Sequence, residues 1–393
     1  MATARRAIKV LLGMALALGL GADAAAAAAK PASADVCGPW PLWQAYAAHF
    51  IQGDGRVVDF HAAHSTSEGQ AYALFFALVA NDRSRFDAVL KWTEANLAGG
   101  DLGANLPAWR WGQREDGSWG VLDPNAASDA DLWLGYTLLE ASRLWQEASY
   151  GELGQRLLAL VVEQEVENLP GLGPMLLPGP EGFRPAEALW RLNPSYLPIQ
   201  LLRALHRYDP KGPWGEMVLP AARLLRETAP HGLAPDWVAY QAGVGWRPDP
   251  DKGAEGSYDA IRVYLWLGML DAAEPLRAPL LQALDGMTRR LRKNPVPPER
   301  GDTLTAEFQG SGPAGFSAAL LPYLAAQDEA ALLARQRQRV EEARRDRLLG
   351  EDPRYYDQNL ALFGTGWLDG RFRFAAEGQL LPAWNTLCRK SRP

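Results

Sequence analysis

Three short segments of this 393-residue chain place a carboxylate just before a strongly apolar stretch, with a serine upstream of the acid. The segments are Ser65–Glu68 before residues 71–80, Ser128–Asp131 before residues 132–144, and Ser257–Asp259 before residues 261–270. Two carboxyl groups in one cleft can work as a general acid and a general base, which is what hydrolysis of a glycosidic bond requires. The segments therefore predict a hydrolytic site built on carboxylates.

Helix capping is the competing explanation for the same residues. Ser65 with Glu68, and Ser128 with Asp131, have the spacing of a capping box, and acids in a first helical turn are favoured by the helix dipole. Any one of the three segments taken alone fits this interpretation. The combination favours a site, because helices that point the same way in a bundle bring their first turns to one end, where carboxylates would line one cleft.

A carboxyl group that donates a proton near neutral pH needs a pKa above its ordinary range. Burial against apolar rings, or a like charge nearby, raises a carboxyl pKa. Glu68 is followed closely by Tyr72, Phe75 and Phe76, which would form an apolar wall if their rings face the cleft. The sequence thus offers one carboxyl group whose pKa the fold could raise.

The elements that must position these carboxylates are predicted to be helices. Apolar residues recur at helical spacing over 153–161, 197–205 and 280–291, and almost no segment alternates with period two. Further helices are expected over residues 40–50, 67–80, 84–98, 129–147, 215–228, 258–270, 315–325, 329–348 and 356–363. The chain is therefore predicted to be all-α, with about twelve helices in six hairpins. Two packed helical domains are the alternative.

The N-terminal segment has the layout of a secretory signal peptide. Basic residues precede an apolar run from Val10 to Leu20, and a run of alanines follows. The apolar run is about half the length of roughly 20 residues that a membrane-spanning helix needs. We expect residues 1–29 to be cleaved, residues 30–393 to form a single catalytic domain without a membrane span, and the mature protein to be periplasmic or secreted.

Composition limits the classes of ligand. The chain has 40 basic and 46 acidic residues, a net charge of −6, which argues against nucleic acid as a partner and suits a neutral ligand. Its 15 tryptophans and 12 tyrosines include many in Gly- or Pro-containing stretches, where they could stack on sugars. Core packing remains the expectation for most of them.

The two cysteines, Cys37 and Cys388, lie near opposite ends of the expected mature chain. An exported protein meets an oxidising compartment in which such a pair can form a disulfide. The alternative is that both remain thiols, because the sequence gives no distance between them. Both alternatives stay open at this point.

Metal and cofactor chemistry have little support. His61, His64 and Glu68 would lie on one face of a continuous helix, but the residues between them resemble a helix start that would turn the histidines away. No H-E-x-x-H, G-x-S-x-G, Walker or G-x-G-x-x-G motif is present. We therefore expect neither a metal nor a cofactor.

Three motifs in matched order resemble the signature regions of glycoside hydrolase family 8. They are SEGQAY from Ser67, ASDAD from Ala127 and YDAIR from Tyr258, and the similarity extends over roughly residues 38–370. The second motif departs from the family pattern at Leu134 and Gly135, which are packing positions. The resemblance implies an (α/α)6 barrel and a monomeric endo-β-1,4-glucanase that inverts the anomeric carbon, needs no cofactor and acts in bacterial cellulose production, in possible association with the synthase machinery.

The resemblance also implies a role for each matched side chain. Glu68 would be the proton donor, Asp259 the base that activates water, and Asp129 the residue that holds and distorts the sugar at the cleavage point. The implied substrate-binding residues are Trp109, Tyr196, Tyr258 and Arg262.

Two alternatives to a cellulase stay open. Members of the family also act on chitosan, xylan or mixed-linkage glucan, so the substrate is not fixed by the motifs. From another class, a non-catalytic glycan-binding protein of the polysaccharide export machinery would share the fold. The presence of both Glu68 and Asp259 favours the enzyme, because a binding protein would not require the pair.

Overall fold

The computed structural model describes residues 36–388, which belong to one compact unit. The predicted signal peptide, residues 1–29, lies outside the described residues. Among residues 36–388, none of the helices combines the length and the hydropathy that crossing a bilayer requires.

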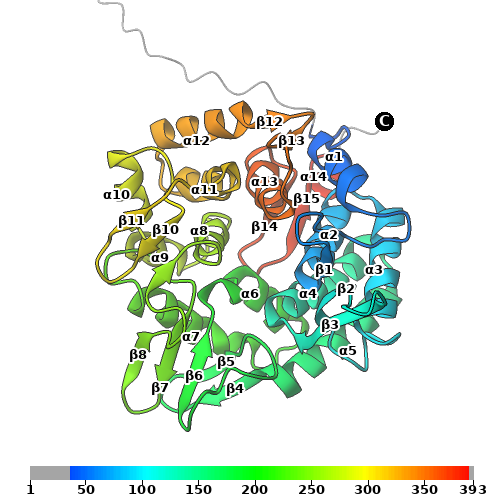
Figure 1. Ribbon diagram of the computed structural model, residues 1–393, viewed down its shortest axis with the longest axis horizontal. Coiled ribbons are helices and arrows are strands. Elements are labelled where there is room, and N and C mark those ends of the chain that lie inside the picture. The colour runs from blue at the N-terminus through cyan, green and yellow to red at the C-terminus, as the bar shows by residue number, and fades with distance from the viewer. Residues whose placement is uncertain (1–35, 389–393) are drawn as a thin grey trace, which may run out of the picture. The chain divides into compact units, whose positions relative to one another are not determined.

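Six helices form the inner ring of this unit (Figure 1). They are α2 (Ser67–Val79), α4 (Ser128–Trp145), α6 (Ile199–Tyr208), α8 (Ala260–Gly268), α11 (Ala314–Ala326) and α13 (Tyr355–Leu368). Helix α2 packs on α4, α4 on α6, α8 on α11, and α11 on α13. The ring closes where Phe363 of α13 contacts Phe76 of α2, with ring centroids 4.5 Å apart, and where Gln200 of α6 donates to the Trp266 carbonyl of α8 at 3.4 Å.

A second set of helices surrounds the inner ring. They are α1 (Pro41–Phe50), α3 (Arg83–Leu97), α5 (Ala148–Glu165), α7 (Trp214–Glu227), α9 (Arg277–Ala283), α10 (Gly286–Lys293) and α12 (Ala330–Glu342), with a short α14 (Ala383–Thr386) near the end. Helix α3 packs on α2, α5 on α4, α7 on α6, α9 on α8, α12 on α11 and α1 on α13. This pairing of inner and outer helices confirms the predicted all-α, (α/α)6 architecture.

Helices α4 and α5 approach closely where two glycines face each other. A Cβ added to Gly135 of α4 would lie 2.5 Å from the Leu158 side chain of α5. A Cβ on Gly154 of α5 would lie 3.1 Å from the Gly135 carbonyl. Gly135, which departs from the family motif, is thus a packing position, because any larger residue would push α5 away from α4.

Two predicted helices end earlier than expected. The apolar stripe over 280–291 divides into α9 and α10, because the Gly286 N–H bonds to the Gly232 carbonyl at 2.9 Å instead of continuing a helix. The helix predicted over 329–348 ends at Glu342, where the chain turns through Asp346 and Arg347 with φ of 46° and 76°. Periodicity alone did not reveal either break.

Short antiparallel strands lie in the connections between helices. The strands are β1 (His64–Thr66), β2 (Ala108–Gln113), β3 (Trp119–Ala126), β4 (Val166–Leu169), β5 (Gly173–Leu176), β6 (Leu189–Leu192), β7 (Val238–Gln241), β8 (Gly245–Pro248), β9 (Glu255–Gly256), β10 (Arg300–Asp302), β11 (Phe308–Gln309), β12 (Arg344–Arg345), β13 (Leu348–Leu349), β14 (Phe372–Phe374) and β15 (Leu380–Pro382). Three sheets have three strands, in the orders β1-β2-β3, β6-β7-β8 and β11-β10-β9. All of these strands except β2 and β3 have at most four residues, too few for alternation to be recognised in the sequence.

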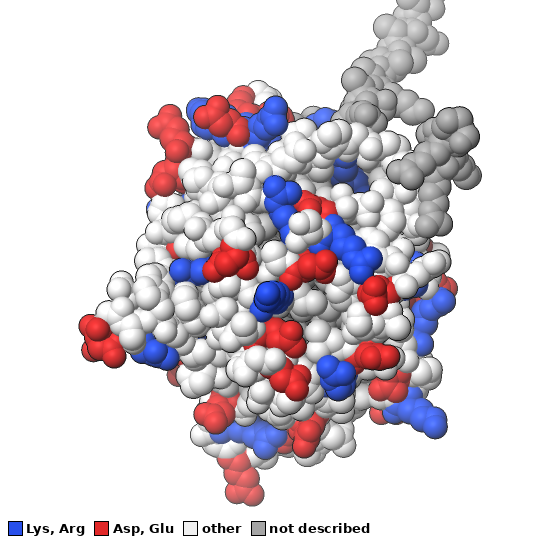
Figure 2. Space-filling view, turned by 90° about the vertical axis from the view of Figure 1, so that its right-hand side faces the viewer, with Lys and Arg blue, Asp and Glu red and all other residues white. Residues whose placement is uncertain are grey.

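Aromatic side chains fill the centre of the ring. Trp133 of α4 is fully buried and contacts Trp266 of α8 and Phe363 of α13, each with ring centroids 5.2 Å apart. Contacts of this kind join three inner helices through one residue and stabilise their spacing. The outer face drawn in Figure 2 carries acidic and basic side chains interspersed, without the gathering of positive charge that nucleic acid would need.

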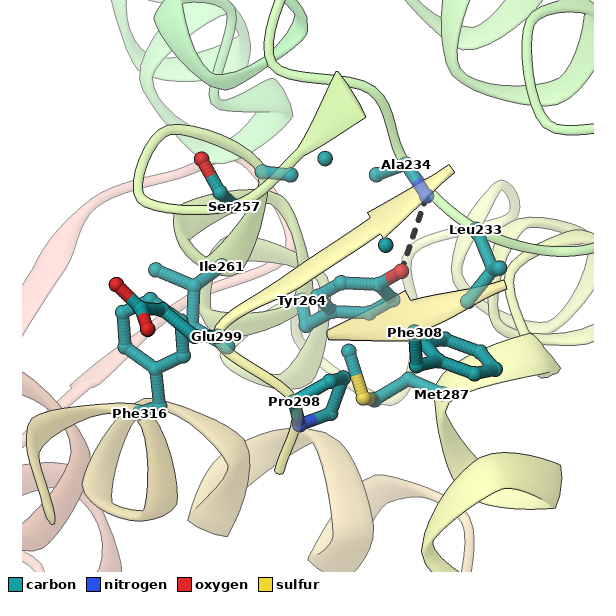
Figure 3. Close-up of a pocket in the computed structure, with 13 residues that line it drawn as sticks. Leu233, Ala234, Ser257, Ile261, Tyr264, Met287, Pro298, Glu299, Phe308 and Phe316 are labelled. Carbon is teal, nitrogen blue, oxygen red and sulfur yellow. Dashed lines mark hydrogen bonds between the residues drawn. The ribbon is translucent and has the colours of Figure 1, made fainter. Parts of the chain in front are cut away.

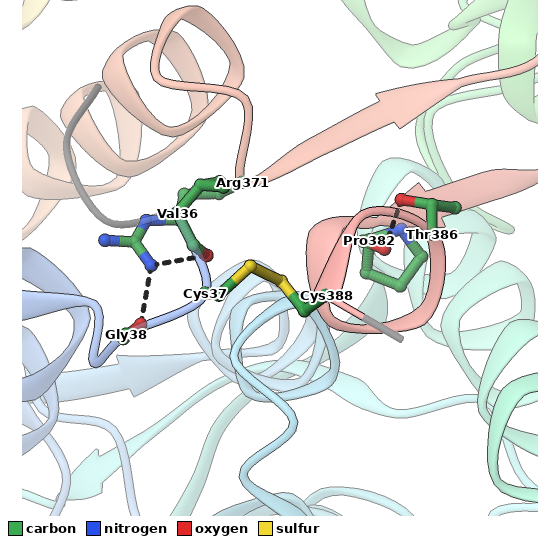
Figure 4. The surroundings of a disulfide bond; sticks show 7 residues. All are labelled: Val36, Cys37, Gly38, Arg371, Pro382, Thr386 and Cys388. Carbon is green, nitrogen blue, oxygen red and sulfur yellow. Dashed lines mark hydrogen bonds between the residues drawn. A yellow bond between two sulfur atoms is a disulfide. The ribbon is translucent and has the colours of Figure 1, made fainter. Parts of the chain in front are cut away.

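A disulfide joins Cys37 to Cys388, across 351 residues of sequence (Figure 4). Arg371 lies beside it and donates to the carbonyls of Val36 and Gly38 at 3.0 and 2.8 Å. Of the two alternatives left open by the sequence, the structure contains the disulfide. It fastens the beginning of the described chain to its end.

We expect removal of this disulfide to lower the free energy of unfolding by about 2–4 kcal/mol, because the unfolded chain regains the entropy of a very long loop. Equilibrium urea unfolding of the protein with and without reductant measures the effect. The Cys37→Ser/Cys388→Ser double variant is the control, and its urea midpoint should be the same with and without reductant. An unchanged wild-type midpoint in reductant would contradict the expectation.

Candidate active site

The first turns of α2, α4 and α8 meet around one buried guanidinium. Arg262 of α8 is 6% exposed and donates from Nη1 to Asp129 Oδ2 at 2.6 Å and to the Tyr72 hydroxyl at 3.0 Å. Its Nη2 donates to Asp259 Oδ1 at 2.5 Å. The structure thus brings two of the three predicted carboxylates to the same cation, one from α4 and one from the start of α8.

Glu68, in the first turn of α2, is the third carboxyl group of this cluster. Trp109 of β2 donates its indole N–H to Glu68 Oε1 at 3.0 Å. Burial and the negative charge of Asp129 raise the pKa of Glu68 to about 7, against the opposing influence of Arg262. At neutral pH, a large share of Glu68 therefore carries a proton.

Asp129 is 2% exposed, and both of its oxygens are engaged. Oδ1 accepts from the Ala130 N–H at 2.9 Å, and Oδ2 accepts from Arg262. Burial raises the pKa of Asp129, while the Arg262 charge and hydrogen bond act in the opposite direction. This carboxylate is held in place by the protein and is poorly placed to exchange protons with water.

Asp259 precedes α8 and has a side chain that is 30% exposed. Its Oδ1 accepts from Arg262, and its Oδ2 accepts from the Trp237 indole N–H at 3.0 Å. The carboxylate therefore reaches solvent while two donors fix its orientation. Its cationic hydrogen-bond partner distinguishes it from the half-buried Glu68, which accepts from a neutral indole.

The other predicted site residues surround this cluster. Tyr196, in the 3-10 turn Pro194–Tyr196, lies with its ring centroid 5.5 Å from the Arg262 guanidinium carbon. Trp109 is 36% exposed, so part of its ring faces solvent beside Glu68. Tyr258 is directed elsewhere, because its hydroxyl donates to Glu299 Oε1 at 3.2 Å.

Two local expectations were wrong. Tyr72 does reach the site, but Phe75 and Phe76 are fully buried in the core, where both contact Phe363. The apolar wall beside Glu68 is therefore not made by those two rings. Both residues lie two turns further along α2 than Glu68, roughly 10–12 Å along the helix axis, so their rings reach the core beneath the site and not the cleft.

The predicted serine caps are not formed either. The Ser65 hydroxyl accepts from Arg56 at 2.8 Å, and α2 is capped instead by Thr66, which accepts from the Gly69 N–H at 3.2 Å. Helix α4 has no side-chain cap, and Ser128 is buried. The capping-box explanation thus fails for both segments.

Asp131, the second acid of the middle motif, does not enter the cleft. It is fully buried, and its carboxyl group contacts that of Glu165 at the end of α5. Burial raises the pKa of each group well above its ordinary value, and the negative charge of Glu165 adds to the effect on Asp131. Since no donor from another residue reaches these oxygens within the described residues, a shared proton is needed for the contact to be favourable.

The metal alternative loses its geometric basis. His64 lies in β1, and His61 precedes it in a turn where Nε2 lies 3.3 Å from Asp352. The two histidines and Glu68 therefore do not share a helical face. Within residues 36–388, no group of His, Cys, Asp and Glu has an arrangement suited to a metal ion.

Sequence analysis missed two residues that contact the cluster or its supports, Asp236 and Trp237. They follow Pro235 in a connection before β7, more than twenty positions from the motif that contains Asp259. The large number of tryptophans was a general signal for ring contacts, but nothing in the local sequence connected this pair with Asp259.

Comparisons with known proteins identify the family of the chain. The profile described as Glycosyl hydrolases family 8 matches residues 20–370. The endoglucanase of Xanthomonas axonopodis pv. citri (strain 306) is 55% identical over 90% of this chain and 92% of its own, and that of Escherichia coli (strain K12) is 47% identical over 91% and 95%.

A solved structure shows the same relationship in three dimensions. The endo-1,4-D-glucanase from Vibrio fischeri ES114 superposes with a TM-score of 0.80 at 41% identity, covering 88% of this chain and 99% of that one. The family resemblance inferred from the three motifs is therefore confirmed. On the profile match and on these relatives, the chain belongs to glycosyl hydrolase family 8.

Proposed function

We propose that the protein is an endo-β-1,4-glucanase that hydrolyses cellulose or a related β-glucan with inversion. Glu68 is the general acid and Asp259 is the general base in this proposal. One observation carries it: two half-buried carboxyl groups beside the same Arg262–Asp129 pair have different partners and different electrostatic surroundings. Burial keeps a proton on Glu68 near neutral pH, while Asp259 is open to water and paired with a cation.

The acid step uses Oε2 of Glu68. The Trp109 indole donates to Oε1 at 3.0 Å, whereas Oε2 has only a long contact with the Ser67 hydroxyl, at 3.5 Å, so Oε2 is the oxygen that carries the proton toward the glycosidic oxygen. The bond between that oxygen and the anomeric carbon breaks as the proton is transferred, so the leaving chain departs as a neutral alcohol.

The base step uses Asp259. A water molecule on the opposite side of the sugar gives a proton to the Asp259 carboxylate as its oxygen attacks the anomeric carbon. The new carbon–oxygen bond is thereby formed from the water, with inverted configuration. Arg262 and Trp237 hold the two carboxylate oxygens during this step. Exchange with solvent then returns the proton from Asp259 to Glu68.

Asp129 and the aromatic residues serve the substrate in this proposal. Asp129 contributes the negative charge that favours the protonated form of Glu68, and it holds Arg262 beside the sugar at the cleavage point. Trp109 offers a partly exposed ring for stacking, and Tyr196 lies beside Arg262 near the attacking water. Tyr258 is 40% exposed, but its hydroxyl is turned to Glu299, so its part in substrate binding rests on the family resemblance.

The polymer and the compartment are inferred from separate observations. The relatives at 45–55% identity that span most of the chain are endoglucanases, and the solved relative is an endo-1,4-D-glucanase, which favours a β-1,4-glucan. A disulfide persists in oxidising compartments, which favours the periplasm or the exterior of the cell. A place in cellulose production, with or without contact with the synthase machinery, and a monomeric state stay predictions from the resemblance.

The first test compares wild type with Glu68→Gln on soluble carboxymethyl cellulose. Loss of proton transfer should lower turnover by about 10²–10⁴-fold and leave polymer binding nearly unchanged. Reducing-end release is measured together with viscosity, which falls early when cuts are internal. Glu115→Gln, in the exposed turn between β2 and β3, is the matched control.

Wild-type inactivity on carboxymethyl cellulose, chitosan, xylan and mixed-linkage glucan would contradict the enzymatic proposal. In that case, the non-catalytic glycan-binding alternative would be preferred. Activity on one of the other three polymers alone would keep the assigned roles and correct the substrate.

The stereochemical proposal has its own test. Proton NMR of cello-oligosaccharide hydrolysis, followed from the first minute, should show the α-anomer of the new reducing end before mutarotation. Inversion requires room for water between the carboxyl groups, at a separation of about 6.5–9.5 Å. Early appearance of the β-anomer would mean retention and would remove the water-activating role of Asp259.

The raised pKa of Glu68 predicts a pH-dependent effect on stability. Folding raises this pKa from 4.5 to about 7, so the stability that the protonated group contributes is present below pH 4.5 and is lost as pH rises through 7. Glu68→Gln removes this loss. Its Tm should therefore match wild type near pH 4.5 and exceed it at pH 8, by on the order of 2 °C.

Scanning calorimetry at both pH values measures the difference. Glu115→Gln should show no pH-dependent difference from wild type, because that side chain is exposed. Equal Tm values for wild type and Glu68→Gln at pH 8 would show that Glu68 ionises without cost.

A further inference from the structure

The start of α8 is held by a carboxylate from a distant part of the chain. Asp236, 7% exposed, accepts from the backbone N–H groups of Ser257 and Ala260 at 2.7 Å each, both through Oδ1. Its Oδ2 accepts from the Ser257 hydroxyl at 2.5 Å. Asp259 lies between those two backbone donors, so the turn that carries it is fastened on both sides.

The backbone around Asp236 is also fixed to the same turn. The Asp236 N–H donates to the Glu255 carbonyl at 2.7 Å. Two residues earlier, the Ala234 N–H donates to the Tyr264 hydroxyl of α8 at 2.9 Å, at the edge of the apolar pocket drawn in Figure 3. A Cβ on Gly256 would lie 2.2 Å from the Ala234 carbonyl oxygen, so the two segments are in direct backbone contact.

The neighbouring residue, Trp237, holds the Asp259 carboxylate itself. Its indole N–H donates to Asp259 Oδ2 at 3.0 Å. Its ring stacks on Phe183 with centroids 5.9 Å apart and planes at 9°, and the Arg191 guanidinium carbon lies 5.3 Å from the ring centroid. Arg191 is in turn paired with Asp249 at 2.7 Å. The direction of the indole N–H is therefore set by packing.

We propose that Asp236 and Trp237 are positioning residues for hydrolysis, Asp236 by fixing the turn that carries Asp259 and Trp237 by fixing the orientation of its carboxylate. This inference rests on the proposed role of Asp259 as the base. Neither residue touches the reacting atoms in this proposal. A displacement of about 1 Å at a reacting group can cost on the order of 10²-fold in rate, which is the size of effect that such residues prevent.

Asp236 accepts from backbone N–H groups at the start of α8, as an N-cap side chain does in other helices. The N-cap residue of α8, Asp259, makes no side-chain cap bond, and the Ala260 N–H donates to Asp236 instead. Burial and the negative charge of Asp259 raise the pKa of Asp236 to about 6, so the group is still largely ionised at pH 7. An asparagine at this position would keep one oxygen for the two backbone donors, whereas alanine would leave both without an acceptor.

The decisive experiment uses Trp237→Phe, which keeps a ring but removes the N–H. The matched control is Trp246→Phe in β8, where the indole N–H donates to Glu227 at 2.9 Å, away from the carboxylate cluster. We expect kcat on carboxymethyl cellulose to fall about ten-fold or more for Trp237→Phe, with KM within two-fold of wild type, and to stay at the wild-type value for Trp246→Phe.

Asp236→Ala and Asp236→Asn form the second pair. Alanine should lower kcat on the order of 10²-fold, and asparagine should recover most of that loss, with cellopentaose binding by tryptophan fluorescence unchanged in both. If Asp236→Ala does not fold, the Trp237 comparison decides. Wild-type kcat in Trp237→Phe, or in folded Asp236→Ala, would overturn the inference.

A substrate whose leaving group needs no proton distinguishes effects on the base step from effects on the acid step. On β-cellobiosyl fluoride, fluoride departs unassisted while water must still be activated, so Glu68→Gln should regain activity and the Trp237 and Asp236→Ala variants should not. Recovery of the positioning variants on the fluoride would overturn the inference. Full activity of Asp259→Asn would reject the proposed role of Asp259 as the base. If Asp259→Asn is inactive and Trp237→Phe is fully active, the role of Asp259 stands and only the positioning inference is rejected.

Discussion

The arrangement of the site depends on one buried cation. A guanidinium at the exposure of Arg262 would be strongly unfavourable without anions and acceptors around it. Asp129 and Asp259 supply the anions, and Tyr72 supplies a further oxygen, so that α2, α4 and the start of α8 share one set of contacts. Because removal of any partner leaves a buried charge poorly compensated, electrostatics fixes the three helix starts as firmly as apolar packing does. The pKa of Glu68 follows from the same pair, since Asp129 raises it and Arg262 lowers it.

The barrel makes this meeting of charges feasible. Inner helices that start at the same end present their unsatisfied backbone N–H groups to one region, and those groups favour carboxylates. Two such contacts are present here: Ala130 donates to Asp129, and Ala260 donates to Asp236. The aromatic centre around Trp133 keeps the inner helices at a fixed spacing beneath the site. Positioning of the carboxylates is thus a consequence of packing that lies one or two turns further along the same helices.

Much of this was predictable from the sequence, and the failures have a common cause. The inner helices were predicted because their apolar residues recur over three or four turns, a signal that survives errors at the ends. The motif resemblance located Glu68, Asp129, Asp259 and Arg262, which the structure places in one cluster. Expectations that used only local spacing failed: Ser65 is engaged by Arg56 and not by its own helix, and Phe75 and Phe76 turn to the core. In each case a partner distant in sequence determines the side chain's direction, and single-sequence patterns contain no information about that partner.

The acids at the helix starts show the same principle in chemical terms. Glu68, Asp129, Asp131 and Asp259 are similar groups near the first turns of inner helices, yet each has a different environment. Glu68 is half-buried beside an indole and a negative charge, Asp129 is enclosed by Arg262, Asp131 is in contact with Glu165, and Asp259 remains open to water. Position in the helix therefore cannot determine which acid donates a proton and which accepts one. The determining contacts come from Trp109, Arg262, Glu165 and Trp237, each contributed by another segment of the chain, so the assignment of roles is a property of the assembled barrel and of no single motif.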